Sequence, residues 1–134
     1  MNFIWPVRVY YEDTDSGGVV YYANYLKFME RARTEYLRHL GYEQDALIKN
    51  ENMVFAVRAI NLDYHKPARF NEYLEVSARV IECKKASMLF EQMITRKDDG
   101  QLLCSGKVRI ASLKADSFKP CPLPKTIREI VSVD

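Results

Sequence analysis

The sequence lacks the marks of several easily recognised protein classes. Its only cysteines, Cys83, Cys104 and Cys121, are widely spaced and form neither a CxxC pair nor a cysteine-histidine zinc motif. No stretch approaches the ~20 apolar residues that cross a membrane, and the first residues show no basic segment followed by an apolar run. We therefore expect no disulfide framework, no metal and no transmembrane segment. We expect a cytoplasmic protein, with peripheral attachment to a membrane left open.

An excess of charge is also missing. The formal net charge is +2, from 20 Lys and Arg against 18 Asp and Glu. So small a surplus provides no basic stripe for nucleic acid, and no nucleic-acid partner is expected. The composition, 48% hydrophobic and 28% charged, is that of an ordinary globular protein. The chain is most simply one domain, residues 1–134, long enough to bury roughly two thirds of its unfolded surface.

What is present is concentrated between Tyr10 and Tyr25, in the stretch YYEDTDSGGVVYYANY. This stretch carries three carboxylates, a Gly-Gly pair, two valines and five tyrosines. A solvated connector needs no paired valines followed by aromatics, whereas a loop that lines an apolar cleft beside a helix does. Gly17 and Gly18 supply backbone freedom for a turn or for the close approach of a ligand.

A helical period follows this loop from about Ala23 to Leu40. The apolar stripe consists of Tyr25, Phe28 or Met29, Ala32, Tyr36 and Leu40, widened by Leu26 and Leu37. The polar side consists of Lys27, Arg31, Arg33, Thr34, Glu35 and Arg38. Asn24 is a candidate N-cap, with Tyr22 or Ala23 as equally good first residues of the helix, and Gly41 stands where a left-handed residue would end it. One long helix is therefore predicted.

Most of the remaining chain alternates between apolar and polar residues, which is the period of strands with one buried face. Strands are predicted at about residues 4–11, 54–65, 74–80, 88–95 and 102–110. The run Lys97-Asp98-Asp99-Gly100 predicts a hairpin turn, because Asp-Gly readily adopts positive φ. Residues 43–52 are read as a short helix or a loop, and a short helix from about Lys125 to Val131 closes the chain.

The predicted order is one strand, one long helix, then a run of antiparallel strands. Such an α+β chain packs economically if the sheet curls its apolar face around the helix. One helix covers only one face of the sheet. The other face is expected to keep Leu89, Met93 and Leu103, and the edge strands keep unpaired backbone groups. We therefore expect subunits to associate.

The stretch VRVYYEDTDSGGVVYYANYLKFMERARTEYLRHLG resembles the opening of the tol-pal-associated acyl-CoA thioesterases (YbgC-like). These belong to the 4-hydroxybenzoyl-CoA thioesterase group of the hot-dog superfamily. The segments VRAINLDYHKPARFNEYLEV, MLFEQMITR and KPCPLPK are similar too, so the resemblance covers essentially the whole chain. The signature positions, followed by Glu-Arg-Ala-Arg on the helix, are Asp15, Gly18, Val20, Tyr21 and Tyr25.

The resemblance implies a hot-dog fold, in which an antiparallel sheet of five strands, with a sixth left open, wraps one long central helix. It implies hydrolysis of the thioester of acyl-CoA, or of acyl carrier protein, to free acid and thiol without metal or cofactor. It also implies a homotetramer built as a dimer of dimers, or at least a homodimer, with active sites at the subunit interfaces.

Thioester hydrolysis needs a group that attacks the carbonyl or activates water, and donors aimed at the developing oxyanion. By resemblance, Asp15 corresponds to the catalytic aspartate, as nucleophile or general base. The backbone N–H of Tyr22 corresponds to the carbonyl-polarising donor. The residues expected to contact substrate are Tyr11, Gly18, Val20, Tyr25 and Glu30.

Three of these assignments have alternatives. Tyr11 lines the acyl slot or packs on its strand, and Tyr25 belongs to the core first and to the pocket second. Glu30 is a rival catalytic carboxylate, because related hot-dog thioesterases place theirs on this helix. Its structural alternative is an ion pair with Arg33, with Arg31 or with a partner subunit.

Position 22 departs from the family, many members of which carry a histidine there. Tyr22 keeps the backbone donor but cannot supply imidazole. Neither His39, at the far end of the helix, nor His65, at a predicted edge or interface, is an obvious substitute. The alternative function is therefore a non-catalytic or weakly active hot-dog protein that binds acyl carrier protein or an envelope-associated complex. A dehydratase is disfavoured, because the loop between Tyr10 and Tyr25 has no histidine.

Overall fold

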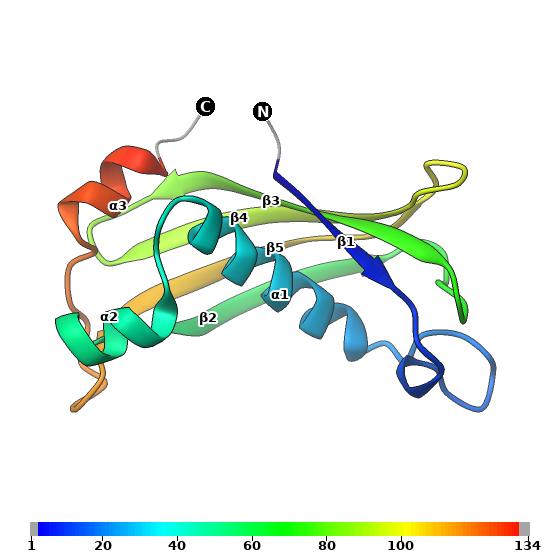
Figure 1. Cartoon of the computed structure of the whole chain (residues 1–134), viewed down its shortest axis with the longest axis horizontal. Coiled ribbons are helices and arrows are strands. Elements are labelled where there is room, and N and C mark those ends of the chain that lie inside the picture. Colours follow the sequence, from blue (N-terminus) through cyan, green and yellow to red (C-terminus); the bar gives the residue numbers. More distant parts are fainter. Residues whose placement is uncertain (1–2, 132–134) are drawn as a thin grey trace.

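The computed structural model describes residues 3–131. Five antiparallel strands, in the order β1-β3-β4-β5-β2, form one sheet that wraps a long helix (Figure 1). The strands are β1 (Phe3–Arg8), β2 (Met53–Tyr64), β3 (Tyr73–Cys83), β4 (Ser87–Arg96) and β5 (Leu102–Lys114). The helices are η1 (Tyr11–Asp13, one 3₁₀ turn), α1 (Asn24–His39), α2 (Gln44–Glu51) and α3 (Lys125–Ile130). This is the predicted α+β hot-dog arrangement, with five strands in the part of the chain that the structure describes.

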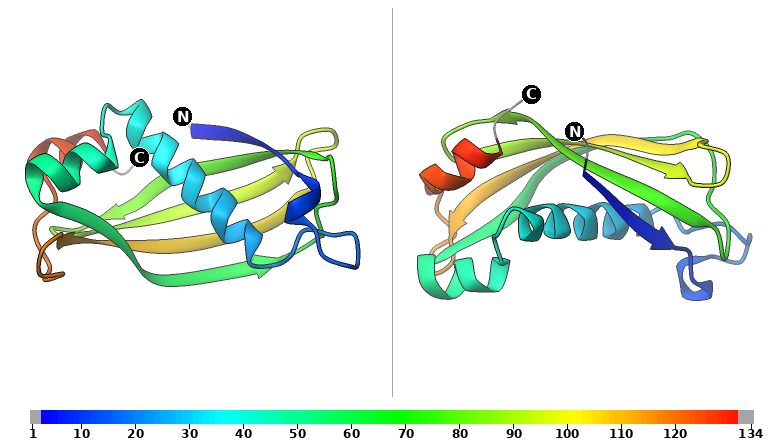
Figure 2. Two further views of the ribbon diagram at one scale, coloured as in Figure 1. Left: turned by 60° about the horizontal axis from the view of Figure 1, so that its bottom comes forward. Right: turned by 45° about the horizontal axis from the view of Figure 1, so that its top comes forward.

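Helix α1 lies across the concave face of the curled sheet (Figure 2). Four of its apolar residues, Tyr25, Phe28, Met29 and Ala32, are at most 3% exposed. They share one hydrophobic cluster with inward-facing residues of the central strands, such as Leu74, Val76, Phe90, Ile94 and Val108. Burial of a large apolar side chain stabilises a fold by about 1.5–3 kcal/mol. The helix is therefore held by the stripe that its period predicted.

The local turn signals are also confirmed. Gly41 follows α1 with φ +99°, and Gly100 in the β4–β5 hairpin has φ +70°. Both values lie in the left-handed region, where a residue with a Cβ is strained. No helix within residues 3–131 is long and apolar enough to cross a membrane.

Two predictions about which way residues face are wrong. Arg33, assigned to the solvent side of the helix, is only 8% exposed, because its Nη1 donates to Gln92 Oε1 at 3.0 Å. Leu103, assigned to the outer face of the sheet, is fully buried. The pairing of β4 with β5 shifts after Ile94, leaving Leu103 as an extra residue that joins the core.

The entry to α1 also differs from the prediction. Strand β1 ends at Arg8, and Tyr11 lies in η1, which is closed by a hydrogen bond from Tyr10 N–H to Asp13 Oδ2 at 2.8 Å. Asn24 is the first residue of α1 and not its cap. Its side-chain amide donates instead to Asp13 O at 2.9 Å, which ties η1 to the start of α1.

Strand β2 is an edge of the sheet and pairs with β5. Residues directly opposite one another on paired strands share a face. Val57, Ile60 and Tyr64 lie opposite the buried Ile110, Val108 and Cys104, so they point toward α1. They are nevertheless 44–49% exposed. The inner side of β2 is therefore apolar but only partly covered by the helix.

Gly106 sets how closely β2 packs on β5. It lies opposite Leu62, and a Cβ at this position would be 2.2 Å from Leu62 Cδ2 and 2.7 Å from Asn61 O. One of these neighbours is backbone, so it cannot move away without shifting the strand. Only glycine fits between the two strands as they are.

Gly106→Ala is expected to lower the free energy of unfolding by about 1–3 kcal/mol, the usual cost of overpacking. Lys107→Ala, on the same strand but exposed, should change it by less than about 0.5 kcal/mol. Urea unfolding measures both values. Equal stability of the two variants would show that β2 can relax away from β5 at no cost.

Candidate active site

The loop that enters α1 is tied to the fold on both sides. Asp15 N–H donates to Val19 O at 2.9 Å, and Thr14 pairs with Val20 in an isolated antiparallel β-bridge. Val20, only 4% exposed, donates its N–H to Ala68 O at 2.8 Å. The loop therefore folds back on itself and is anchored beside the segment that connects β2 to β3.

Asp15 lies at the exposed tip of this loop. Its Oδ1 accepts a hydrogen bond from Gly17 N–H at 2.8 Å, and a Cβ on Gly17 would come within 3.2 Å of that oxygen. Gly18 has φ +79°, which favours glycine. Within residues 3–131 no hydrogen bond engages the other carboxylate oxygen. That oxygen is available to a substrate or a water molecule.

A free backbone donor lies just before α1. Tyr21 N–H donates to Asp13 O at 3.0 Å, and Asn24 N–H donates to Tyr21 O at 2.8 Å. The N–H of Tyr22, between them, has no acceptor among the described residues. Groups at this position carry the positive end of the helix dipole, so Tyr22 N–H is suited to an oxyanion.

A cavity of about 260 Å³ opens at the start of α1, lined by Val20, Tyr22, Tyr25, Tyr64, His65, Lys66 and Pro67. Across it, the Tyr64 hydroxyl donates to Tyr22 O at 3.1 Å. Tyr25 is buried, and its hydroxyl accepts the Ala68 N–H at 3.0 Å. Tyr25 thus serves the core and the cavity together.

Three tyrosines of this region, Tyr21, Tyr25 and Tyr64, have raised pKa values. The adjacent Tyr22 hydroxyl, and to a smaller extent burial and the Asp15 charge, raise the pKa of Tyr21. Burial raises the pKa of Tyr25 and of Tyr64 above its ordinary value. With pKa values raised above the ordinary tyrosine range, all three phenols stay neutral at pH 7.

The predicted site residues do not all come together. Asp15, Gly18 and Val20 belong to the loop, and Tyr22 and Tyr25 line the cavity beside it. Tyr11 lies in η1, 80% exposed, with its ring 5.8 Å from that of Phe70. Its place in an acyl slot stays a prediction.

His65 lines the same cavity as Tyr22, a proximity that the sequence did not reveal. The contact arises because the end of β2 packs beside the start of α1, and no local pattern reports it. The imidazole Nε2 is engaged with Ser105 Oγ at 2.8 Å. His65 is therefore near the site, but its ring is held on β5.

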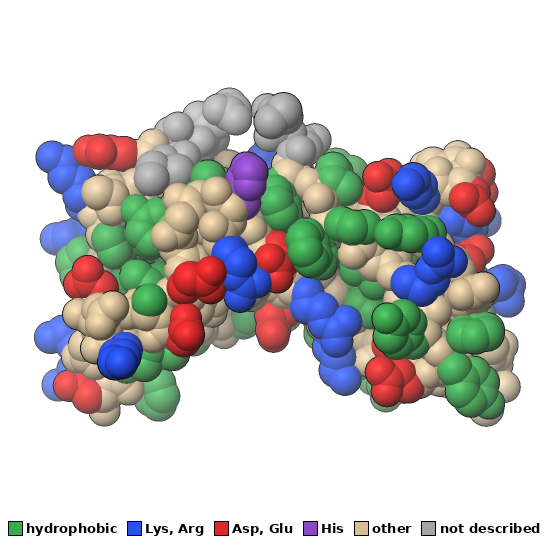
Figure 3. Space-filling model, viewed as in Figure 1, with side chains coloured by type: hydrophobic (Ala, Val, Ile, Leu, Met, Phe, Trp, Pro, Cys, Tyr) green, Lys and Arg blue, Asp and Glu red, His purple; other side chains and the backbone are tan. Residues whose placement is uncertain are grey.

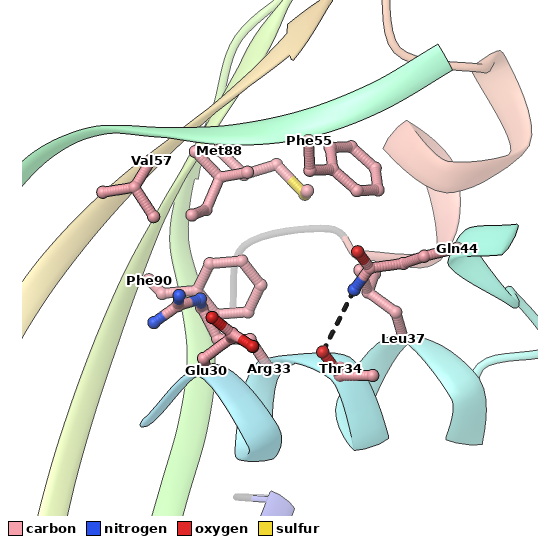
Figure 4. A pocket seen from close by; sticks show the side chains of 10 residues that line it. Glu30, Arg33, Thr34, Leu37, Gln44, Phe55, Val57, Met88 and Phe90 are labelled. Carbon is pink, nitrogen blue, oxygen red and sulfur yellow. Dashed lines mark hydrogen bonds between the residues drawn. The ribbon is translucent and has the colours of Figure 1, made fainter. Parts of the chain in front are cut away.

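Glu30 lines a second cleft of about 260 Å³, farther along α1 (Figure 4). The helical wall of this cleft is polar and consists of Glu30, Arg33, Thr34 and Gln44, with Leu37 beside them. The sheet wall is apolar and consists of Phe55, Val57, Met88, Phe90 and Ile110. No ion pair within 4.0 Å joins Glu30 to a cation in the described chain, so the predicted pairing with Arg33 or Arg31 is not formed.

Arg33 is the principal residue that sequence reasoning missed. Burial lowers its pKa to about 10, so it remains a cation at neutral pH. Its partner Gln92 is fully buried and donates through Nε2 to Met29 O and Ser77 O, both at 3.1 Å. The sequence held a signal for Gln92, because it lies two residues from both Phe90 and Ile94 and so faces inward with them, where a polar side chain needs hydrogen-bond partners.

Exposed hydrophobic side chains occur at the end of the molecule where the loop and η1 lie (Figure 3), and several of them are aromatic. Five of them, between 45% and 80% exposed, are Tyr10, Tyr11, Tyr21, Tyr22 and Phe70. Exposed aromatic side chains that gather at one place commonly mark a binding surface. The candidate carboxylate Asp15 belongs to the same loop.

Comparisons with known proteins agree with this geometry. A family model described as thioesterase-like superfamily matches residues 9–131. The chain is 44% identical over 127 residues to the acyl-CoA thioesterase YbgC of Haemophilus influenzae, across 95% of this chain and 92% of that protein. It is 44% identical over 125 residues to the acyl-CoA thioester hydrolase YbgC of Escherichia coli, across 93% and 92%. A crystal structure of a probable thioesterase from Bartonella henselae superposes with a TM-score of 0.87 at 34% identity, across 92% and 100%.

Proposed function

Because this chain belongs to the thioesterase-like superfamily, we propose that it hydrolyses acyl-CoA thioesters with Asp15 as its catalytic carboxylate. The products are the free acid and the CoA thiol. Relatives at 44% identity that are named acyl-CoA thioester hydrolases support this substrate class. The observation that carries the assignment is the accessible Asp15 carboxylate on the loop that also presents the unpaired Tyr22 N–H.

The thioester carbonyl oxygen accepts the Tyr22 N–H, and the helix dipole stabilises the negative charge that develops there. A single donor of this kind is worth about 2.7–4 kcal/mol of transition-state stabilisation. Two routes then use Asp15. Its carboxylate attacks the carbonyl carbon to form an anhydride that water cleaves, or it takes a proton from an attacking water. In both routes the thiolate leaves readily, so no strong general acid is required.

The other predicted contacts are assigned around this pair. Gly18 allows the loop backbone to approach the thioester, and Val20 and Tyr25 form the wall beside it. Tyr11 belongs to the group of exposed aromatic side chains near the loop, where a bound acyl-CoA or a second subunit would contact it. Glu30 contacts the acyl group farther along α1. Tyr22 acts through its backbone, because a phenol does not replace imidazole as a base.

Asp15→Asn is expected to lower kcat/KM for acyl-CoA by at least ~100-fold, the usual cost of losing a positioned base or nucleophile. Glu12→Gln is the matched control, because Glu12 is an exposed carboxylate of the same loop and should retain the wild-type rate. Hydrolysis of short and long acyl-CoAs, followed by thiol release, measures both.

Two outcomes would contradict the proposal in different ways. Near-background rates for wild type and Asp15→Asn alike would favour the alternative, an interaction protein that binds acyl carrier protein or an envelope complex. Equal and substantial rates would move the chemistry to another carboxylate, and Glu30→Gln would then be the variant that loses activity.

In the proposed assembly two chains form a homodimer, and two such dimers form a homotetramer. Support for the dimer comes from β2, an edge strand whose inner side is 44–49% exposed at Val57, Ile60 and Tyr64. Antiparallel pairing of two β2 edges would satisfy their free backbone groups and cover these side chains. Met93, 41% exposed on the outer face, offers a second contact for the tetramer.

Analytical ultracentrifugation is expected to find a dimer or tetramer. Amide hydrogen exchange should be slow along the whole of β2, including the N–H groups on its outer edge, which β5 does not pair. The outward N–H groups of β1 serve as an internal control, because β1 is the other edge strand of the sheet. A monomer whose β2 amides exchange as fast as those of β1 would rule out the pairing.

Three finer assignments belong to the same proposal: a cytoplasmic location, acyl carrier protein as an alternative acyl donor, and an association with the tol-pal envelope system. They rest on the family resemblance and on the group of exposed aromatic side chains near the loop, which offers a docking surface beside the site. Activity assays with acylated carrier protein address the second of them directly.

A further inference from the structure

The two cavities lie along the same boundary, between α1 and β2. Leu26, Glu30, Arg33 and Leu37 follow one another at steps of three or four and so share one side of α1. The cavity at the start of the helix contains Tyr64 of β2, and the second cleft contains Val57 and Phe55 of the same strand. An acyl chain whose thioester sits at Tyr22 N–H would therefore extend along α1 toward the second cleft.

The second cleft is not a plain hydrocarbon pocket. Its sheet wall presents Phe55, Val57 and Met88, whereas Glu30 and Arg33 point from the helix toward that wall (Figure 4). A saturated chain end would shield these two charged groups from water and offer them nothing in return. That is costly for a buried cation and for a carboxylate.

Arg33 has donors to spare. A guanidinium carries five N–H donors, and Arg33 makes one hydrogen bond to a described residue, Nη1 to Gln92 Oε1 at 3.0 Å. The side chain is only 8% exposed and lines the cleft. Gln92 is in turn fixed by Met29 O and Ser77 O. Gln92 thus positions the guanidinium, which keeps unused donors at the cleft.

Glu30 supplies the complementary acceptor. It lies one turn before Arg33, is exposed, and forms no ion pair within 4.0 Å in the described chain. A hydroxyl group between these side chains would accept from Arg33 and donate to Glu30. A carboxylate in the same place would pair with Arg33 but be repelled by Glu30.

We propose that Arg33 and Glu30 are specificity-determining residues that recognise a hydroxyl group on the far part of the acyl chain. This inference rests on the proposed function and adds the substrate class, a hydroxylated medium-length acyl group. Glu30 lies about 9 Å along the helix from Asn24, at a rise of 1.5 Å per residue. Arg33 leans back toward the same level, as helical side chains do. The recognised hydroxyl therefore lies on the order of 10 Å from the first turn of α1.

The test compares three chains of equal length: octanoyl, octanoyl with a hydroxyl on its last carbon, and octanoyl with a carboxylate there. Calorimetry measures binding of their non-hydrolysable CoA thioether analogues, and kcat/KM is measured for the thioesters. Wild type is expected to prefer the hydroxylated chain over the plain one by at least about tenfold, since hydrogen bonds to charged groups are among the stronger ones.

Arg33→Met should abolish this preference, and Arg31→Met, an exposed arginine of the same helix, should retain it. Glu30→Gln should reduce the preference for the hydroxyl and improve binding of the carboxylate. Because Glu30 is exposed, its variant still tests the inference if Arg33→Met, which leaves Gln92 Oε1 unpaired, does not fold.

Wild type without a preference for the hydroxylated chain would overturn the inference, as would Arg33→Met or Glu30→Gln with the wild-type preference. Failure of the proposed function is distinguishable from either result. In that case none of the thioesters is hydrolysed, while the binding preference of the thioether analogues still decides the roles of Arg33 and Glu30.

Discussion

A single helix packed on a curled five-stranded sheet cannot cover the whole concave face. The position of the uncovered part determines where the cavities and the exposed apolar side chains of this molecule lie. The apolar stripe of α1 packs against the central strands, so the edge strand β2 faces the polar side of the helix. Val57, Ile60 and Tyr64 remain 44–49% exposed there. The same geometry leaves two cavities along one side of α1, one at its start and one farther along.

The chemistry is concentrated at the N-terminal end of this boundary. The loop before α1 folds back on itself, so a free carboxylate and a free backbone N–H come from one short segment. Gly17 and Gly18 make that fold possible, one by the absence of a Cβ near Asp15 and the other by its positive φ. The helix dipole makes the Tyr22 N–H a better donor to an oxyanion, whatever side chain position 22 carries.

Local patterns predicted much of this architecture. The 3.6-residue period located α1, the alternation located all five strands, and Asp99-Gly100 located the hairpin. What failed depended on contacts between distant residues. Arg33 was placed in solvent because its partner, Gln92, is 59 positions away, and Leu103 was placed outside because a one-residue bulge has no clear local signal. Asp15 and Tyr22 could be nominated from the loop and the family resemblance, but the neighbourhood of Tyr22 with His65 depends on how β2 meets α1.

In the proposed arrangement the thioester sits at the start of α1 and its acyl chain runs along the helix toward Arg33. A crystal structure of the protein with a non-hydrolysable thioether analogue of an acyl-CoA would locate both parts of the ligand. We expect a carbonyl oxygen about 2.7–3.1 Å from Tyr22 N, with Asp15 beside the carbonyl carbon and the chain in the cleft below Phe90. A carbonyl bound beside Glu30, with no contact to Tyr22 N–H, would contradict this placement.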